Sequence, residues 1–398
     1  MDKFSIKKIN TRYIIYQILF FSICAGTSGF AVTYLMGNGF SASQTGLILS
    51  ISNICSCLMQ PILGDMLDRL KTFVLPQIVA GCFAAGFVCF FLMQILKPSI
   101  IIFGILFGMG NFMLQITNSL NNSICAYYSN RNFSMNYGLG QGVGSLAFSF
   151  ASLGYGYVME ALGIRSMIWI VLGLLGVLAV TALGYPKVND LVTNTVEKKK
   201  EDRVSIVEFF SKYKLFVIAM TGVLMVGVCH AMSENYFIAI FQSMGGGSED
   251  VGISFFIGCL SAAPFFIFFE KIQKKINALY FLKTAGLFFM LKTALLILAT
   301  QVWHVYLIQL LQAFTYGFLF QPLYYFARQR ISEADLVKGQ AVAVSMYLLG
   351  TASGGFVGGR ALDLLGLDKM LMLAFLVAFA GTVVINLSLM RGRKIYGN

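Results

Sequence analysis

The sequence predicts an all-α protein that crosses a membrane about twelve times, with its helices in two pseudo-symmetric bundles of six. Three observations support this prediction. Of the 398 residues, 58% are hydrophobic and only 12% are charged, whereas soluble domains carry about 25% charged residues. The mean hydropathy is +0.77. The apolar residues form runs long enough to cross a bilayer, and one long polar segment divides these runs into two equal sets.

The individual spans are read from the apolar runs, each about 20 residues long. The chain should therefore consist mainly of transmembrane helices joined by short loops. The expected spans lie near residues 13–36, 44–66, 74–95, 100–128, 136–158 and 166–185 in the first half, and near 215–242, 251–269, 278–299, 303–327, 339–360 and 371–390 in the second.

The long polar segment runs from Pro186 to Arg203 and has the composition of a solvated linker. The stretch Val204–Tyr213 that follows has apolar residues at helical spacing with charges opposite, which is typical of an amphipathic helix on the inner leaflet. We therefore expect an N-terminal bundle over residues 1–185, a cytoplasmic linker with an amphipathic helix over 186–214, and a C-terminal bundle over 215–398.

Lysine and arginine residues are distributed unevenly among the loops. The N-terminal segment, the loops after the even-numbered spans and the C-terminal segment are rich in them, and the alternate loops are poor. The positive-inside rule then places both termini in the cytoplasm, in a cell membrane. The same distribution explains the formal charge of +12 without a nucleic-acid partner. We expect a monomer surrounded by the lipid bilayer.

The sequence shows no pattern typical of catalysis or cofactor binding. The eight cysteines lie inside the expected spans without metal-ligand spacing, and the chain has two histidines in all. No Ser/His/Asp arrangement and no phosphate-binding loop is recognisable. We therefore expect a protein that is not an enzyme and uses neither a metal nor another cofactor. An ion or solute gradient, rather than ATP, would have to drive any transport.

The span 215–242 carries two ionisable residues, His230 and Glu234, four positions apart. On a helix this spacing places them on one face, one turn apart. An ionisable side chain deep in a bilayer costs several kcal/mol and normally faces the bundle interior, where it marks a path for substrate or protons. Lys292 lies roughly 20 Å along its own helix at about 1.5 Å per residue, in the same half of the membrane.

A pair between Glu234 and Lys292 is the leading hypothesis for this region, because a buried charge is costly alone and can break even when paired. We expect the two charges to face each other across a hydrated cavity. Protonation of Glu234 would then weaken its hold on Lys292 and couple protons to solute movement, with His230 as a candidate relay. Two alternatives stay open: a purely structural ion pair, and a histidine that is simply hydrogen-bonded within a packed bundle.

Several short motifs resemble those of a known transporter family. In the second span and the loop after it, Gly64 is followed by Asp68 and Arg69 with the spacing G-x-x-x-D-R. Together with the other motifs, this segment resembles the major facilitator superfamily over nearly the whole chain. Within it, the closest pattern is the oligosaccharide–proton symporter (lactose permease-like) and phenylpropionate/nucleoside transporter branch. The other matching motifs are Ser43-Gln-Thr-Gly46, Gln60-Pro61, Tyr137-Gly138 with Gly142, and Lys338-Gly-Gln-Ala341 with Gly350, Gly354, Gly355 and Gly358-Gly359.

The resemblance implies a major facilitator fold, with a conformational switch at Gly64, Asp68 and Arg69. A carboxylate there can accept from the N–H groups at a helix N-terminus in one facing of the carrier and must release them in the other. A plainer interpretation is that Asp68 and Arg69 anchor a tight turn. In the symporter branch, Glu234 matches an acidic residue of span seven and Lys292 matches a coupling arginine of span nine.

The chain departs from the symporter branch at sugar-binding positions: Gln141 stands where that branch has an arginine, and its span-four carboxylate, near Ser123, is absent. Neutral hydrogen-bonding groups remain, which suit a neutral polar solute, with tyrosines to stack on a ring. Each amide could equally form an interhelical hydrogen bond without touching a ligand. The candidate substrate-binding residues are Gln141, Asn118, Asn122, Gln312, Tyr316, Gln321 and Asn235.

Glycines recur at a spacing of four in spans five and eleven. Gly138/Gly142 and Gly140/Gly144 form two overlapping G-x-x-x-G pairs, and residues 354–359 are similar. Such pairs permit close approach of helices. They could provide smooth faces for a rocking motion, or serve helix packing alone.

Together these features predict a secondary active transporter that moves a small polar solute, such as a sugar or a nucleoside, by alternating access with proton coupling. A drug or metabolite exporter of the same fold is the main alternative, because the 37 phenylalanines would suit an aromatic cavity. A non-transporting membrane sensor is a further alternative, although the sequence shows no soluble output domain. A channel would need a continuous polar file or a ring of charges, which is not recognisable here.

Overall fold

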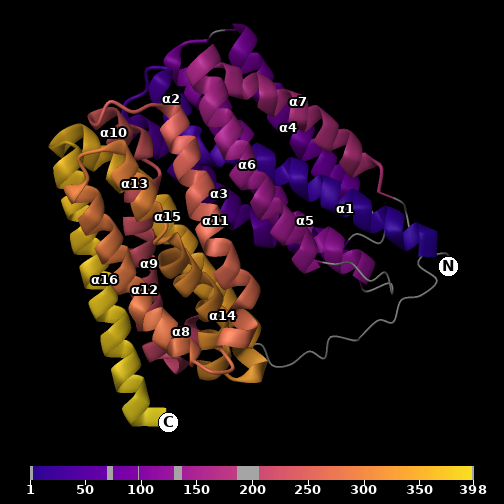
Figure 1. Cartoon of the computed structure of the whole chain (residues 1–398). Helices are drawn as coiled ribbons and strands as arrows, with labels where there is room; N and C mark the ends of the chain where they lie inside the picture. The colour runs from indigo at the N-terminus through magenta and orange to yellow at the C-terminus, as the bar shows by residue number, and fades with distance from the viewer. Residues whose placement is uncertain (1–2, 70–74, 97, 130–136, 186–205, 397–398) are drawn as a thin grey trace. The chain divides into compact units, whose positions relative to one another are not determined.

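The computed structural model describes residues 3–69, 75–96, 98–129, 137–185 and 206–396. Every regular element within these ranges is a helix (Figure 1). The all-α fold predicted from the apolar runs is therefore confirmed. The main part of the expected linker, residues 186–205, lies outside the described residues.

By its internal contacts the chain forms two compact units, which are described separately. The main boundary between the two units lies in the polar segment in the middle of the chain. Two short stretches each belong to the other unit than the residues around them. The first unit comprises Met1–Phe40, Leu47–Val196 and Val251–Phe256; the second comprises Ser41–Gly46, Glu197–Asp250 and Ile257–Asn398.

The first unit begins with a bent span. Its elements are α1 (Lys3–Cys24), the π-helical turn η1 (Ala25–Gly29), α2 (Ala31–Gly37), α3 (Ala42–Arg69), α4 (Leu75–Leu96), α5 (Ile100–Ser129), α6 (Tyr137–Leu162) and α7 (Ser166–Leu183). The axis turns by 47° between the segments Ile9–Gly29 and Ala31–Gly37. α1 packs on α6 and α7, and α4 packs on α5 and α7.

The second unit is organised around α9, which packs on both α15 and α16, while α12 packs on α14 and α16 (Figure 1). Two of its expected spans are interrupted, as described below for the functional site. Its elements are α8 (Ile206–Lys212), α9 (Lys214–Glu234), α10 (Phe237–Ser243), α11 (Ser248–Ile272), α12 (Ala278–Leu298), α13 (Val302–Gln309), η2 (Ala313–Gly317, π-helical), α14 (Phe318–Arg330), η3 (Glu333–Asp335, 3-10), α15 (Leu336–Leu365) and α16 (Leu367–Tyr396).

The contact between α9 and α15 depends on glycine. A Cβ built on Gly350 would lie 2.2 Å from the carbonyl oxygen of Leu224, and one on Gly354 would lie 2.5 Å from that of Val228. Both neighbours are backbone atoms that cannot rotate away, so a larger residue would push the two helices apart. The glycines of span eleven therefore permit the close helix approach that the sequence predicts.

In α6 only one of the two predicted glycine pairs lies against a neighbouring helix, and its neighbours are side chains rather than backbone. A Cβ on Gly140 or Gly144 would lie 2.3 or 2.6 Å from an aromatic ring of α1. Among the described residues, no atom lies within 4 Å of such a Cβ on Gly138 or Gly142. The prediction of two overlapping packing pairs is wrong for the second pair, because residues two positions apart on a helix point about 200° apart.

Nine helices in the described part of the chain are long and apolar enough to cross a membrane, and the bent pair of α1 and α2 makes a tenth candidate. The other two expected spans differ from these. α6 is long but carries glycine, serine and tyrosine along its length, and residues 303–327 are divided among α13, η2 and α14. Large apolar side chains such as Leu298 and Ile101 are 73% and 71% exposed, as lipid-facing side chains would be.

The short helix α8 precedes α9. Its Phe209 is 1% exposed and lies in the hydrophobic core of the second unit, with ring centroids 4.9 Å from Tyr213 and 6.4 Å from Phe216. Glu208 is exposed. Phe209 thus packs on protein while Glu208 is exposed, and a position of this helix on the inner leaflet stays a prediction.

Candidate functional site

The seventh expected span is interrupted at its carboxylate. α9 ends at Glu234, Asn235 occupies the C-cap, and α10 begins at Phe237. The tenth expected span is interrupted in a similar way, because α13 ends at Gln309 and the π-helical turn η2 begins after Gln312. Irregular backbone at membrane depth is tolerated where protein encloses it or where it lines a cavity, and such breaks are typical of ion and solute sites.

The Glu234 carboxylate and the Lys292 ammonium form a direct ion pair within the second unit. Their side chains are only 10% and 3% exposed. The residues lie on α9 and α12, and the contact agrees with the similar depth that the helical rise predicts for them. The ammonium donates directly to the carboxylate, so the two charges are in contact, and a hydrated cavity at this pair stays a prediction.

Two glutamines complete the surroundings of the ammonium. Lys292 Nζ donates to Gln309 Oε1 at 3.0 Å and to Gln312 Oε1 at 2.6 Å. An ammonium has three N–H donors, so one carboxylate and two carboxamides satisfy all of them. Thr315 Oγ1 lies 3.2 Å from the same Gln312 oxygen, and the backbone oxygens of Leu311 and Gln312 are alternative acceptors for its proton at 3.2 and 3.3 Å.

The end of α9 is an unfavourable place for an isolated carboxylate. The C-terminal end of a helix carries partial negative charge, which repels an anion. The Lys292 ammonium offsets this repulsion and the loss of hydration of Glu234. A buried pair of this kind roughly breaks even against apolar residues, whereas removing one partner costs about 3–5 kcal/mol. The energy of each charge therefore depends strongly on the state of the other.

His230 precedes Glu234 by one turn on α9, and aromatic rings surround it. The imidazole centroid lies 5.5 Å from the ring of Phe289 and 6.1 Å from those of Tyr316 and Tyr347. Among the described residues, its Nδ1 has no hydrogen-bond partner. The alternative of a hydrogen-bonded core histidine therefore does not hold at this nitrogen. A role as proton relay stays a prediction.

Gln309 is a site residue that the sequence interpretation leaves out. It is 1% exposed at the end of α13, and Ser261 Oγ donates to its backbone oxygen at 3.3 Å. One signal could have identified it: Gln309 lies three residues before Gln312, a spacing that places both on the same face of a helix. Gln312 is among the candidate substrate-binding residues, whereas Gln309 is not.

The other candidate binding residues of the second unit are Tyr316, Gln321 and Asn235. Tyr316, in η2, stacks on Phe320 with ring centroids 5.1 Å apart. Gln321 on α14 and Asn235 at the end of α9 are half-buried. Their contact with a solute stays a prediction.

In the first unit, Gln141 is half-buried on α6 and Asn118 is exposed on α5. The neighbouring Asn121, which the sequence interpretation passes over, is buried and accepts a hydrogen bond from the hydroxyl of Tyr16. The remaining predicted residues fall in α3 and α5, but their side chains lie outside the described residues: Gly64, Asp68, Arg69 and Asn122.

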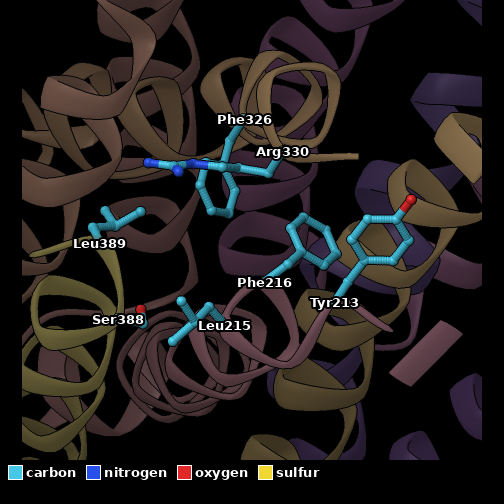
Figure 2. Close-up of a pocket in the computed structure, with 7 residues that line it drawn as sticks. All are labelled: Tyr213, Leu215, Phe216, Phe326, Arg330, Ser388 and Leu389. Carbon is cyan, nitrogen blue, oxygen red and sulfur yellow. The ribbon is translucent and has the colours of Figure 1, made fainter. Parts of the chain in front are cut away.

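A crevice opens at the other end of α9 (Figure 2). It begins where α9 begins, about 30 Å from Glu234 at about 1.5 Å per residue. It is therefore separate from the ion pair. Its lining residues are Tyr213, Leu215, Phe216, Phe326, Arg330, Ser388 and Leu389.

The chemistry available at the ion pair is the exchange of protons and hydrogen bonds. Within the described residues, no group of three or more histidine, cysteine, aspartate or glutamate side chains is placed to hold a metal ion. The groups at hand are a carboxylate, an ammonium, an imidazole and two carboxamides.

A helical chain with many apolar spans, and a buried ion pair where two of them break, defines a membrane transporter rather than an enzyme. Residues 11–378 match the model of the MFS_1 like family. The chain belongs to this family, and so to the major facilitator superfamily of transporters. The resemblance indicated by the loop and glycine motifs is therefore confirmed.

Two similar proteins illustrate the relationship. The uncharacterized transporter YwbF of Bacillus subtilis (strain 168) is 26% identical over 384 residues, which cover 89% of this chain and 86% of that protein. The crystal structure of a mutant of the nucleoside transporter NupG matches with a TM-score of 0.80, covering 96% of this chain and 99% of that chain. Because the identity to that structure is 15%, the match shows a shared fold and no more.

Proposed function

We propose that this transporter is a secondary active carrier that moves a small polar solute across the cell membrane by alternating access, coupled to protons. It would act as a monomer with both termini in the cytoplasm. The observation that carries the coupling proposal is the buried pair of Glu234 and Lys292 at the break between α9 and α10.

Coupling would follow from the dependence of each charge on the other. Protonation of Glu234 removes its charge and weakens its hold on Lys292, so the two protonation states favour different arrangements of α9 and α12. His230, one turn before Glu234 on the same helix, is the candidate to pass the proton on.

The solute would be neutral and rich in hydrogen-bonding groups. Amide side chains, with a tyrosine for stacking, suit a sugar or a nucleoside. NupG is described as a nucleoside transporter, which supports nucleosides as the first class to test. The residues proposed to contact the solute are Gln141, Asn118, Asn122, Gln321, Asn235 and Tyr316.

Proteoliposomes with an imposed pH gradient would test the coupling. The parent protein should accumulate one labelled nucleoside or sugar against its concentration gradient. Glu234→Gln should equilibrate the same solute without accumulating it, because its side chain cannot take up a proton. Asp368→Asn neutralises an exposed carboxylate at the start of α16 and should behave like the parent. Equal accumulation by Glu234→Gln and the parent would rule out Glu234 as the coupling site.

An exporter of aromatic compounds is a second candidate, favoured by the rings near the site. Phe266 and Phe320 lie 5.8 and 5.1 Å from the ring of Tyr316, and such a surface suits a planar apolar ligand. Vesicles of defined orientation separate the two functions. A carrier for polar solutes takes up nucleosides or sugars, whereas an exporter extrudes aromatic dyes and ignores both.

A further inference from the structure

The geometry around Lys292 points to a task for Gln309 and Gln312 other than solute binding. We propose that their carboxamides hold the Lys292 ammonium in place when Glu234 is uncharged, so that they act as positioning residues for the coupling lysine. The contacts are described above: both oxygens accept from Nζ, beside the carboxylate.

The orientation of Gln309 is the first support for this assignment. Its Nε2 has no hydrogen-bond partner among the described residues, although the residue is 1% exposed. A buried polar group without a partner costs about 1–3 kcal/mol. The opposite orientation of the amide would turn N–H donors toward a cation. The carboxamide therefore serves the ammonium through its oxygen and leaves its own N–H groups unsatisfied.

The neighbours of both glutamines support the same contact. The hydroxyl of Thr315 lies 3.2 Å from the Gln312 carboxamide oxygen, within hydrogen-bond distance of it. Beside Gln309, a Cβ built on Gly258 would lie 3.2 Å from Oε1. The absence of a side chain at Gly258 leaves room for the carboxamide where it meets Lys292. Three helices besides α12 thus contribute to the surroundings of one ammonium: α9 through Glu234, α11 through Gly258 and α13 through Gln309.

Electrostatics explains why this arrangement matters for a carrier. With Glu234 ionised, the site is neutral overall, and the carboxylate provides most of the stabilisation of Lys292. Protonation of Glu234 leaves a buried charge of +1, and an unpaired buried ammonium costs several kcal/mol. Two carboxamide oxygens aimed at Nζ reduce this cost, because hydrogen bonds to charged groups are stronger than neutral ones. The protonated state then becomes accessible without loss of the fold.

This inference relies on the proposed function only for the role of the protonated state in transport. The contacts themselves can be tested in the solute-free protein, without a pH gradient. If Glu234 does not couple protons to transport, solute accumulation in vesicles will show it. If the glutamines do not hold Lys292, the unfolding experiments will show it, so the two failures are distinguishable.

The experiment is a double-mutant cycle on thermal unfolding of the purified full-length chain in lipid nanodiscs. Gln312→Leu and Gln309→Leu are each introduced into the parent sequence and into the Glu234→Gln variant. Glu234→Gln imitates the protonated acid. The fall in Tm caused by either leucine should be at least about twice as large with Glu234→Gln as with the parent, since contacting residues are not additive. Equal falls in both backgrounds would overturn the proposal.

Thr293→Val is the matched control. This buried residue follows Lys292 on α12, and its hydroxyl lies 3.3 Å from Cys229 Sγ and donates to Phe289 O at 2.8 Å. Its effect on Tm should therefore be the same in both backgrounds. A larger effect with Glu234→Gln would show that any polar loss in this region behaves alike, and would count against a specific role of the glutamines.

Moving the carboxylate from position 234 to position 309 provides a second, independent test. Gln309→Glu places a carboxylate within reach of Nζ, so in the Glu234→Gln background it should raise Tm back toward the parent value. The same substitution in the parent places two carboxylates beside one ammonium and should lower Tm. If Gln309→Glu fails to raise Tm in the Glu234→Gln background, the proposal is wrong even where the leucine variants fold too poorly to be measured.

Discussion

The second unit contains two lysine–carboxylate pairs whose surroundings differ. Lys292 and Glu234 are 3% and 10% exposed in their side chains. Lys212 and Asp335 join the end of α8 to η3, with Nζ 2.9 Å from Oδ2 and side-chain exposures of 48% and 2%. The two pairs lie near opposite ends of α9. The same two functional groups therefore occur once enclosed by protein and once with the lysine in solvent.

The difference shows that environment, not chemistry, decides what an ion pair can do. An exposed lysine regains water when its partner is lost, so the pair contributes little to stability. A buried lysine cannot, and the state of its partner then controls its energy. Asp335 also accepts from the hydroxyl of Tyr213 at 2.9 Å, which indicates a structural tie between α9 and the loop before α15. Only the buried pair has the mutual dependence that a coupling site needs.

The largest effect is expected from removing one buried charge. Glu234→Ala leaves Lys292 with two neutral acceptors, so the free energy of unfolding should fall by about 3–5 kcal/mol. Chemical denaturation in mixed micelles or nanodiscs would measure the loss. If Glu234→Ala costs no more than Lys212→Ala, the contrast between the two pairs is wrong.

Replacing both buried partners should separate stability from transport. Glu234→Leu combined with Lys292→Met removes both charges, and such a replacement is often neutral or stabilising by about 1–4 kcal/mol. We expect stability much closer to the parent than for Glu234→Ala, with solute accumulation abolished. Uptake in vesicles and Tm would be measured on the same preparations. Retained accumulation would show that the pair is purely structural.

Breaking the exposed pair should have a small effect. Lys212→Ala leaves Asp335 with its tyrosine donor, and the lost attraction was already weakened by solvent around the lysine. We expect a slight fall in Tm that disappears when the salt concentration is raised, because salt screens exposed charges. A large fall that persists at high salt would show that Lys212 is more than a surface partner.

The smallest expected effect is a pH dependence at the exposed pair. The hydrogen bond from Lys212 lowers the pKa of Asp335, and the same bond raises the pKa of Lys212. The contribution of Asp335 to the free energy of unfolding is thus complete above its unfolded pKa of about 3.9. It is lost as the pH falls through the lower pKa of the folded state. The contribution of Lys212 to the free energy of unfolding is complete below its unfolded pKa of about 10.4. It is lost as the pH rises through the higher pKa of the folded state.

Unfolding measured from neutral pH downward would check this dependence. The difference in stability between the parent and Asp335→Asn should be constant near neutrality and should shrink only below about pH 4. A difference that changes around neutral pH would point to another titrating group.

Much of the fold could be predicted from the sequence because its determinants are local. Apolar run length locates the helices, and the polar segment after Pro186 separates the two sets of spans. The positions of Glu234 and Lys292 followed from the constant rise of a helix. The glycine faces were harder: spacing alone could not tell which pair on α6 meets α1, because that depends on how the whole helix is rotated.

The sequence by itself determined a transporter of many spans with two opposite charges at similar depth, since hydrophobicity and helical geometry act residue by residue. Only the tertiary structure decided that the two charges are in direct contact, that α9 ends at Glu234, and that Gln309 and Gln312 complete the surroundings of Lys292. Those features depend on where side chains of separate helices converge. That convergence is set by packing across the unit, so the spacing within one segment, such as that of Gln309 and Gln312, cannot show which side chain of another helix it meets.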